Sequence, residues 1–180
     1  MKGKGNDGQG NIPERDLWET KQDFWNKLDL QYKFDFDCCA SENNTKTKLF
    51  SSDFKNSIPI GNNWVCWMNP PFSQAEEMFK IFFSKVKKGV AIYRCDNMET
   101  KIWQDTIFKY ASWIFIPKGR IAYTPFDVGN MRNGMGTRFP SALIGIGTKI
   151  PKNIDGVSLL VQYSSCEYEK DLEIIKRRLE

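Results

Sequence analysis

Apolar positions along the chain follow two different periods, which alternate from the first third of the sequence to its end. Short apolar runs are typical of buried strands, and longer segments with apolar residues three and four apart are typical of amphipathic helices. The expected strands are 33–37, 49–50, 64–68, 90–95, 112–117, 141–147 and 156–163. The expected helices are the segment that follows Thr20 and the ranges 73–89, 98–111 and 167–180. Strands that alternate with helices predict a three-layer α/β domain with a mainly parallel sheet.

Local signals predict where some of these elements begin and end. Thr20 is an expected helix N-cap, with Asp23 three residues later as its capping-box partner. Ser73 is expected to cap the helix that Gly89 ends. The stretch 118–124 follows an expected strand directly, and we expect it to turn back as a hairpin.

Composition places the chain among ordinary single-domain proteins. The Gly-, Asn- and Lys-rich stretch 1–12 is expected to be a disordered tail, and 13–180 a single domain. No run approaches the roughly 18 apolar residues of a membrane span, and the first residues lack the apolar core of a secretory signal. We therefore expect a cytoplasmic protein that does not contact membranes.

Two residue types restrict the possible chemistry. The sequence contains 0 histidines, which excludes a histidine base, a histidine metal ligand and a Ser-His pair. Its 5 cysteines are an odd number without C-x-x-C spacing, which indicates reduced thiols and no zinc site. The net charge of +4 permits an acidic partner such as nucleic acid without requiring one.

The strand expected over 64–68 stops at the motif Asn69-Pro70-Pro71-Phe72. Neither proline has a backbone N–H, and each forces the residue before it into an extended conformation. An amide oxygen at Asn69 and the carbonyl of Pro70 can accept the two hydrogens of an amino group on a ring that stacks on Phe72. The alternative is a turn that only ends a strand, which any Asn-Pro pair can form.

Two further stretches carry candidate chemistry. Asp37 ends an expected strand, and the small residues 38–41 leave room for a ligand with an ammonium group. The alternative is a carboxylate that caps a turn. The glycine-rich loop 125–139 is longer than a compact domain normally carries, and its Arg132 and Arg138 suit a polyanion. The alternative here is a flexible surface loop.

Several pieces of the chain together resemble a known family. In order, they are WETKQDFWNKL, FDFDCCASENNTK, WMNPPF, DNMETKIWQ, FIPKGRI and FPSALIGIG. They resemble the phage-type DNA adenine-N6 methyltransferases, the small Dam-like enzymes of bacteriophages and prophages. The resemblance runs from about Trp18 to Gly147. The combination of D-x-x-A-S-x-x-N, N-P-P-F and G-R-I in this order is more specific than any one piece.

The resemblance implies a Rossmann-like methyltransferase fold that uses S-adenosylmethionine to methylate the N6 amino group of adenine in double-stranded DNA. The target adenine is then expected to be flipped out of the helix, inside a bacterial or phage-infected cell. The implied catalytic residues are Asn69, Pro70, Pro71 and Phe72. The implied cofactor-binding residues are Thr20, Asp37, Cys39, Ala40, Ser41, Asp53 and Asn69, and the implied DNA-binding residues are Arg120, Arg132 and Arg138.

The chain departs from the family pattern at three places. Lys21 replaces the proline of a W-x-T-P motif, Cys39, Ala40 and Ser41 replace a glycine-rich turn, and Phe72 stands where tyrosine is commoner. The alternative functions are methylation of cytosine N4, methylation of a protein glutamine amide, and nucleic-acid binding without catalysis.

Overall fold

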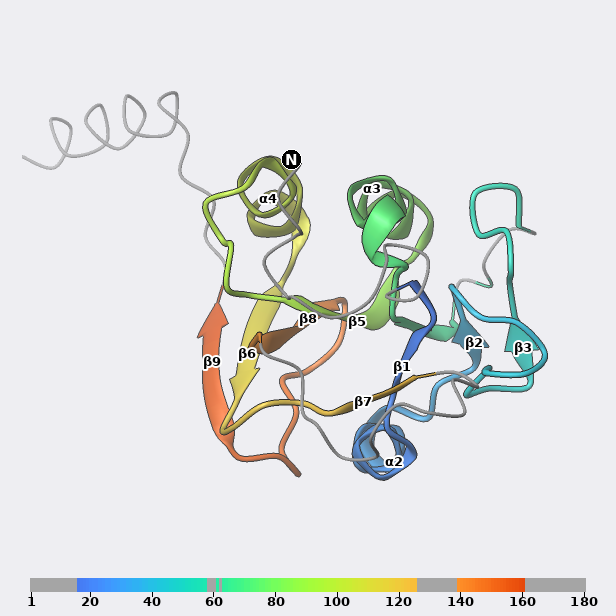
Figure 1. Ribbon diagram of the computed structural model, residues 1–180, viewed down its shortest axis with the longest axis horizontal. Coiled ribbons are helices and arrows are strands. Elements are labelled where there is room, and N and C mark those ends of the chain that lie inside the picture. The colour runs from blue at the N-terminus through green and yellow to red at the C-terminus, as the bar shows by residue number, and fades with distance from the viewer. Residues whose placement is uncertain (1–15, 58–60, 62, 126–138, 161–180) are drawn as a thin grey trace, which may run out of the picture.

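A seven-stranded sheet forms the centre of the computed structural model, which describes residues 16–57, 61, 63–125 and 139–160. The strands lie in the order β3-β2-β4-β5-β8-β6-β9 (Figure 1). They are β2 (Phe36–Asp37), β3 (Leu49–Phe50), β4 (Val65–Met68), β5 (Lys88–Arg94), β6 (Trp113–Pro117), β8 (Ser141–Ile146) and β9 (Gly156–Leu160). All seven expected strands are therefore confirmed, with β9 followed as far as Leu160.

The sheet has one parallel half and one antiparallel half. Strands β3, β2, β4 and β5 pair in parallel, whereas the pairs β5–β8, β8–β6 and β6–β9 are antiparallel. The molecule is thus a mixed α/β protein, and the expectation of a mainly parallel sheet is correct for the first half only. Strand β8 lies between β5 and β6 and runs opposite to both. Antiparallel neighbours of this kind can be joined without a helical crossover.

The order of the parallel strands reverses at β2. The chain passes from β2 to β3 on one side and then returns to β4 on the other side. In open α/β sheets, the carboxyl ends of the strands at such a reversal flank the crevice that binds ligands. Asp37 ends β2, and Asn69 follows β4, so both candidate residues lie at this point.

Helices cover both faces of the sheet, as Figure 1 shows. Helix α2 (Gln22–Tyr32) lies on one face, and α3 (Ala75–Lys85) lies on the other beside the π-helical segment η2 (Ile102–Ile107) and α4 (Phe108–Tyr110). The three expected helices within the described residues are confirmed.

Alternating side chains of β4 divide the core between these two layers. Trp67 packs in the cluster that contains Trp25 and Leu28 of α2. Cys66 and Met68 pack in the other cluster, with the aromatic side chains of α3. Successive residues of a strand point to opposite faces, so β4 joins both layers of the core and is fixed in position by them.

Thr20 does not cap helix α2. It ends strand β1 (Trp18–Thr20), which pairs antiparallel with β7 (Tyr123–Pro125) in a small second sheet. The N-cap position of α2 is Lys21, which makes no side-chain capping bond. The prediction was wrong because pairing with Tyr123 places Thr20 in a strand, where its side chain is 1% exposed.

Neither predicted end of helix α3 is correct. A short 3-10 turn, η1 (Phe72–Gln74), precedes the helix, its N-cap position is Gln74, and Ser73 instead donates a hydrogen bond to Asp16. The helix ends at Lys85, and Gly89 lies in β5. A Cβ at Gly89 would lie 2.8 Å from both the Cys66 carbonyl oxygen and the Phe82 ring, so this glycine permits close packing.

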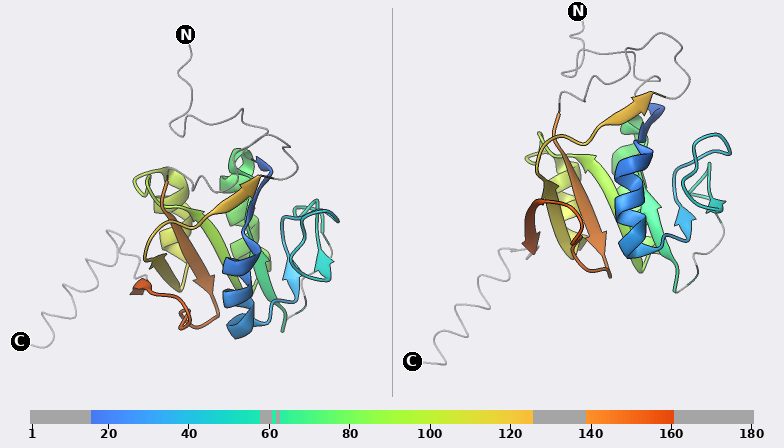
Figure 2. Two further views of the ribbon diagram at one scale, coloured as in Figure 1. Left: turned by 60° about the horizontal axis from the view of Figure 1, so that its bottom comes forward. Right: turned by 90° about the horizontal axis from the view of Figure 1, so that it is seen from below.

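The expected hairpin over 118–124 does not form. Strand β7 pairs with β1 rather than with β6, and the two views in Figure 2 show β1 and β7 crossing one end of the sheet. The tail expected over 1–12, residues 126–138 of the expected loop and the helix expected over 167–180 lie outside the described residues. Within the described part of the chain, no helix has the length and apolar character needed to cross a bilayer.

Candidate functional site

A cavity of about 340 Å³ opens at the carboxyl ends of β2 and β4, at the reversal of strand order. Its lining includes most of the predicted cofactor and catalytic residues, namely Thr20, Asp37, Cys39, Ala40, Ser41, Asp53, Asn69 and Pro71. These residues come from β1, from the turns after β2 and β3, and from the turn after β4. Folding therefore brings together residues that are more than forty positions apart in the sequence.

Asp37 is the buried acidic group of the cavity. Its carboxylate is 3% exposed, and one oxygen accepts a hydrogen bond from the Cys39 N–H at 3.3 Å while the other accepts one from the Lys46 N–H at 3.1 Å. Burial raises the pKa of Asp37 to about 6, although these two bonds and the charge of Lys46 oppose the rise. Each carboxylate oxygen has a further lone pair, so Asp37 can also accept a bond from a cationic ligand.

The turn after Asp37 is closed by its own side chains. The Asn44 side-chain oxygen accepts bonds from the N–H of Ser41 at 2.7 Å and from its hydroxyl at 3.1 Å. This Asx-type closure replaces a glycine-rich turn, because side-chain bonds stabilise the tight path. The small residues Ala40 and Ser41 leave the cavity open beside it.

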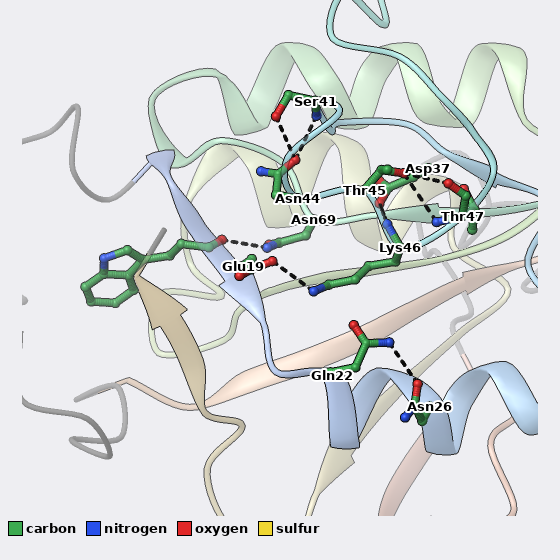
Figure 3. A network of polar contacts seen from close by, with 11 residues as sticks. Glu19, Gln22, Asn26, Asp37, Ser41, Asn44, Thr45, Lys46, Thr47 and Asn69 are labelled. Atoms are coloured by element: carbon green, nitrogen blue, oxygen red, sulfur yellow. Dashed lines mark hydrogen bonds and ion pairs between the residues drawn. The ribbon is translucent and has the colours of Figure 1, made fainter. Parts of the chain in front are cut away.

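Strand β1 forms another wall of the cavity and is joined to the acidic turn by an ion pair. The Lys46 ammonium lies 2.8 Å from a Glu19 carboxylate oxygen, and their side chains are 10% and 24% exposed (Figure 3). Thr20, the next residue of β1, is buried in the same wall, and its hydroxyl has no hydrogen-bond partner among the described residues. An unpartnered buried hydroxyl in a cavity wall is suited to a polar ligand.

The orientation of the Asn69 amide is fixed by the same strand. Its side-chain nitrogen donates to the Trp18 carbonyl at 2.8 Å (Figure 3). A carbonyl can only accept, so the nitrogen of the amide must face Trp18 and the oxygen is left for another donor. Among the described residues, no hydrogen bond to this oxygen or to the Pro70 carbonyl is formed, whereas the Pro71 carbonyl accepts one from the Gln74 N–H at 3.1 Å.

Phe72 lies outside the cavity lining, in a cluster of aromatic rings. Its ring centroid is 5.5 Å from Phe139, 6.2 Å from Tyr93 and 6.3 Å from Trp18, and all three contacts are edge-on or tilted. Trp18 itself stacks on Phe139 at 6.2 Å. Phe72 therefore has no face-to-face neighbour within the described residues, although it is partly buried by rings on its edges.

Of the three predicted DNA-binding residues, Arg120 lies in the described part of the chain. Arg120 follows β6 and lines a separate hollow of about 360 Å³ with Lys27, Lys118 and Asp155. Strand β6 runs in the same direction as β4, since both β6 and β5 pair antiparallel with β8, so Arg120 lies near the same edge of the sheet as Asn69. Arg132 and Arg138 lie outside the described residues.

Asp53 lines the cavity but has a structural partner as well. Its carboxylate accepts hydrogen bonds from the backbone and side chain of Asn56, the latter at 3.0 Å, and it is exposed. Neither Cys38 nor Cys39 supplies a reactive thiol, because burial raises the pKa of both above the usual range. No group of three His, Cys, Asp or Glu side chains in the described residues is placed to hold a metal ion.

A family model described as DNA N-6-adenine-methyltransferase (Dam) matches residues 9–150 of this chain. The chain belongs to the Dam family. It is 38% identical over 65 residues to the DNA N-6-adenine-methyltransferase of Haemophilus phage HP1, which covers 33% of this chain and 36% of that protein. It is 36% identical over 75 residues to the enzyme of the same name from Escherichia phage T1, covering 39% of this chain and 32% of that protein. The matched stretches thus span about a third of each relative.

Sequence reasoning missed three polar residues of this Dam-family cavity. Glu19, Asn44 and Lys46 line it and hold its walls together. Asn44 closes the quoted D-x-x-A-S-x-x-N pattern, so the sequence contained a signal for it. Glu19 and Lys46 are 27 positions apart, and no local sequence pattern links them.

Proposed function

We propose that this chain transfers the methyl group of S-adenosylmethionine to the N6 amino group of adenine in DNA. The observation that carries the proposal is the Asn69 amide, which the Trp18 carbonyl orients so that its oxygen is left as an acceptor at the end of β4. Membership in the Dam family supports the choice of adenine and DNA. The placement of helices on both faces and the reversal of strand order at β2 support a Rossmann-like fold.

The cavity has the chemistry that this cofactor requires. In this proposal, Asp37 accepts a hydrogen bond from the amino group of its methionine part, and the Thr20 hydroxyl, which has no partner among the described residues, bonds another of its polar groups. Ala40 and Ser41 leave space beside the turn. A cavity with a polar group available to a ligand supports an enzyme over a nucleic-acid-binding protein that has lost its cofactor.

The reaction then depends on how the protein holds the adenine amino group. When bound, the cofactor supplies a methyl group already activated by its sulfonium, so the chain needs no nucleophile and no histidine. The lone pair of the amino nitrogen is delocalised into the ring, which makes it a poor nucleophile. The Asn69 side-chain oxygen and the Pro70 carbonyl accept its two hydrogens, which favours the form with the lone pair localised on nitrogen.

The aromatic cluster accounts for capture of the base. An adenine must leave the DNA stack to reach such a pocket, at a cost of a few kcal/mol. Stacking on an aromatic face returns about 1–3 kcal/mol per base, and Phe72 has no stacked neighbour within the described residues. A phenylalanine suffices in this position because stacking needs a π face and no hydroxyl.

The experiment that tests the proposal is incubation of the protein with S-adenosylmethionine and unmethylated plasmid DNA, followed by digestion to nucleosides and mass spectrometry. We expect N6-methyladenine. N4-methylcytosine instead would show that the amino acceptor is cytosine, and no methylated nucleoside together with cofactor binding would contradict DNA methylation.

A further inference from the structure

Strand β1 has only three residues, yet it reaches both parts of the site. Residues 16–20 line the cavity in succession, while the Trp18 ring packs against Phe72 and Phe139. Through its carbonyl, Trp18 also orients the Asn69 amide. The position of this short strand therefore determines the direction of the one amide oxygen that the proposed function requires.

Strand β1 pairs with β7, and side chains at Asp16 and Glu19 attach it to other parts of the site. Asp16 accepts hydrogen bonds from the backbone and side chain of Ser73, an exposed contact two residues before the strand begins. Glu19, one residue after Trp18, forms the ion pair with Lys46. Lys46 in turn donates its backbone N–H to Asp37 at 3.1 Å, so a single residue joins the acidic turn to β1.

We propose that Glu19 and Lys46 are positioning residues for methyl transfer, because their ion pair holds β1 where the Trp18 carbonyl fixes the Asn69 amide. This inference rests on the proposed function and adds to it two residues that touch neither the adenine nor the methyl group. It links the cofactor side of the site, through Lys46 and Asp37, to the orientation of Asn69.

Burial gives this ion pair more weight than the exposed pair on α3. Its side chains are 10% and 24% exposed, whereas those of the Lys80–Glu76 pair on α3 are 59% and 53% exposed at a similar 2.7 Å. Exposed pairs contribute little because water and salt screen them. Removal of one partner from a shielded pair breaks the contact and leaves the other charge without compensation, which is strongly destabilising.

Lys46 lines the cavity, so a direct contact with the cofactor is the competing explanation. The two explanations predict different effects of the double variant relative to the two single variants. If the pair acts as a unit, Glu19→Gln and Lys46→Gln have non-additive effects, since either one already breaks the link. If Lys46 binds the cofactor independently of Glu19, the two effects add, and the cofactor dissociation constant changes at least as much as the rate.

The test uses the full chain and the variants Glu19→Gln, Lys46→Gln and their combination, with Glu76→Gln as the control for loss of an exposed pair. Three quantities are measured: the single-turnover rate of methyl transfer to DNA, the dissociation constant of S-adenosylmethionine, and amide hydrogen exchange of residues 16–21. Thermal unfolding confirms that each variant is folded.

We expect Glu19→Gln to lower the single-turnover rate by about 10- to 100-fold, the range that a small misplacement of a reacting group produces. The cofactor affinity stays within about 3-fold, exchange in 16–21 accelerates, and the double variant is no slower than the slower single variant. Glu76→Gln matches the wild type in all three measurements.

Three results would overturn the inference: an unchanged rate in Glu19→Gln, additive rate losses, or unchanged exchange over 16–21. A wild-type protein that methylates no DNA would instead reject the proposed function. Even then the exchange measurement decides whether the ion pair holds β1, so the two failures remain distinguishable.

Discussion

The two sides of the Asn69 turn differ in chemical character: one is polar and the other is aromatic. On one side lies the polar cavity, where Asp37 and the Glu19–Lys46 pair are joined by hydrogen bonds and charge. On the other side, Phe72 lies among aromatic rings whose nearest centroid is 5.5 Å away. Strand β1 contributes to both sides, with Glu19 in the cavity and the Trp18 ring in the aromatic cluster.

This difference indicates that the two sides are suited to different ligands. A cavity that contains a buried carboxylate and an unpartnered hydroxyl suits a charged, polar cofactor, and a cluster of rings suits a flat base. Asn69 lies between them, where we propose that the methyl donor and the amino group meet. A change on one side should therefore leave the function of the other side largely intact.

The largest effect is expected at Asn69, which lies between the two sides. Asn69→Ala removes one of two acceptors for the adenine amino group, and loss of one preorganised group of this kind typically costs on the order of 10²–10³ in rate. Cofactor affinity should hardly change, because the Asn69 oxygen is proposed to touch only the target base. Incorporation of tritiated methyl groups into DNA measures the rate. Full activity would show that N-P-P-F is only a turn that ends a strand.

On the polar side, Asp37→Asn should weaken the binding of S-adenosylmethionine. A hydrogen bond to a charged partner contributes about 1.5–3 kcal/mol, which corresponds to about 10- to 150-fold in the dissociation constant. Calorimetry on the folded variant measures this loss. An unchanged affinity would remove Asp37 from the cofactor site and leave it as the group that closes the turn.

The same carboxylate should make cofactor binding depend on pH. Burial raises the pKa of Asp37 to about 6 in the protein without cofactor, so the group is ionised above that pH and neutral below it. Only the ionised form attracts an ammonium group, so affinity should fall about 10-fold per unit of pH below about pH 6. Asp37→Asn should lose this dependence. The same slope in the variant would assign it to another group.

On the aromatic side, Phe72→Ala should reduce methyl transfer by weakening capture of the flipped base. The stacking contribution of about 1–3 kcal/mol corresponds to about 5- to 150-fold in the efficiency with DNA. Phe72→Tyr keeps the π face and should retain most activity, so it is the matched control. Equal losses in the two variants would argue against stacking as the role of Phe72.

The smallest effect is expected at Arg120, away from both sides. Arg120→Ala should lower DNA affinity modestly and reduce the slope of log affinity against log salt by about 1, the value for one phosphate contact. Filter binding at several salt concentrations measures the slope, and methyl transfer at saturating DNA should be unchanged. A wild-type slope would exclude a phosphate contact at Arg120.

Residues of the polar side were easier to predict from the sequence than strand β1, which forms part of its wall. Asp37 and Asn69 were singled out because Asp37 ends one short apolar strand and Asn69 follows another, and the parallel pairing of β2 and β4 brings these strand ends together. The role of β1 was missed, because a three-residue strand has no periodicity and Thr20 carries a helix-capping signal. Its pairing with β7 is a long-range contact that no local pattern reports.

The antiparallel pairing of β5, β8, β6 and β9 could not be predicted from local sequence patterns, for a similar reason. The apolar runs of β6 and β8 predict strands, but neither run states its direction or its neighbour. Gly89 was also misassigned from the local pattern, because a glycine after a helical segment is typical of a helix end. Its place in β5 is explained by the close approach of Cys66 and Phe82, which no local pattern reports.

We propose that cofactor and base are held on opposite sides of Asn69. The most direct test is titration of S-adenosylmethionine into Asp37→Asn and Phe72→Ala side by side, in the absence of DNA. We expect an affinity loss of about 10-fold or more for Asp37→Asn and a dissociation constant within about 2-fold of wild type for Phe72→Ala. Equal losses in both variants, or a larger loss in Phe72→Ala, would contradict the division of the site.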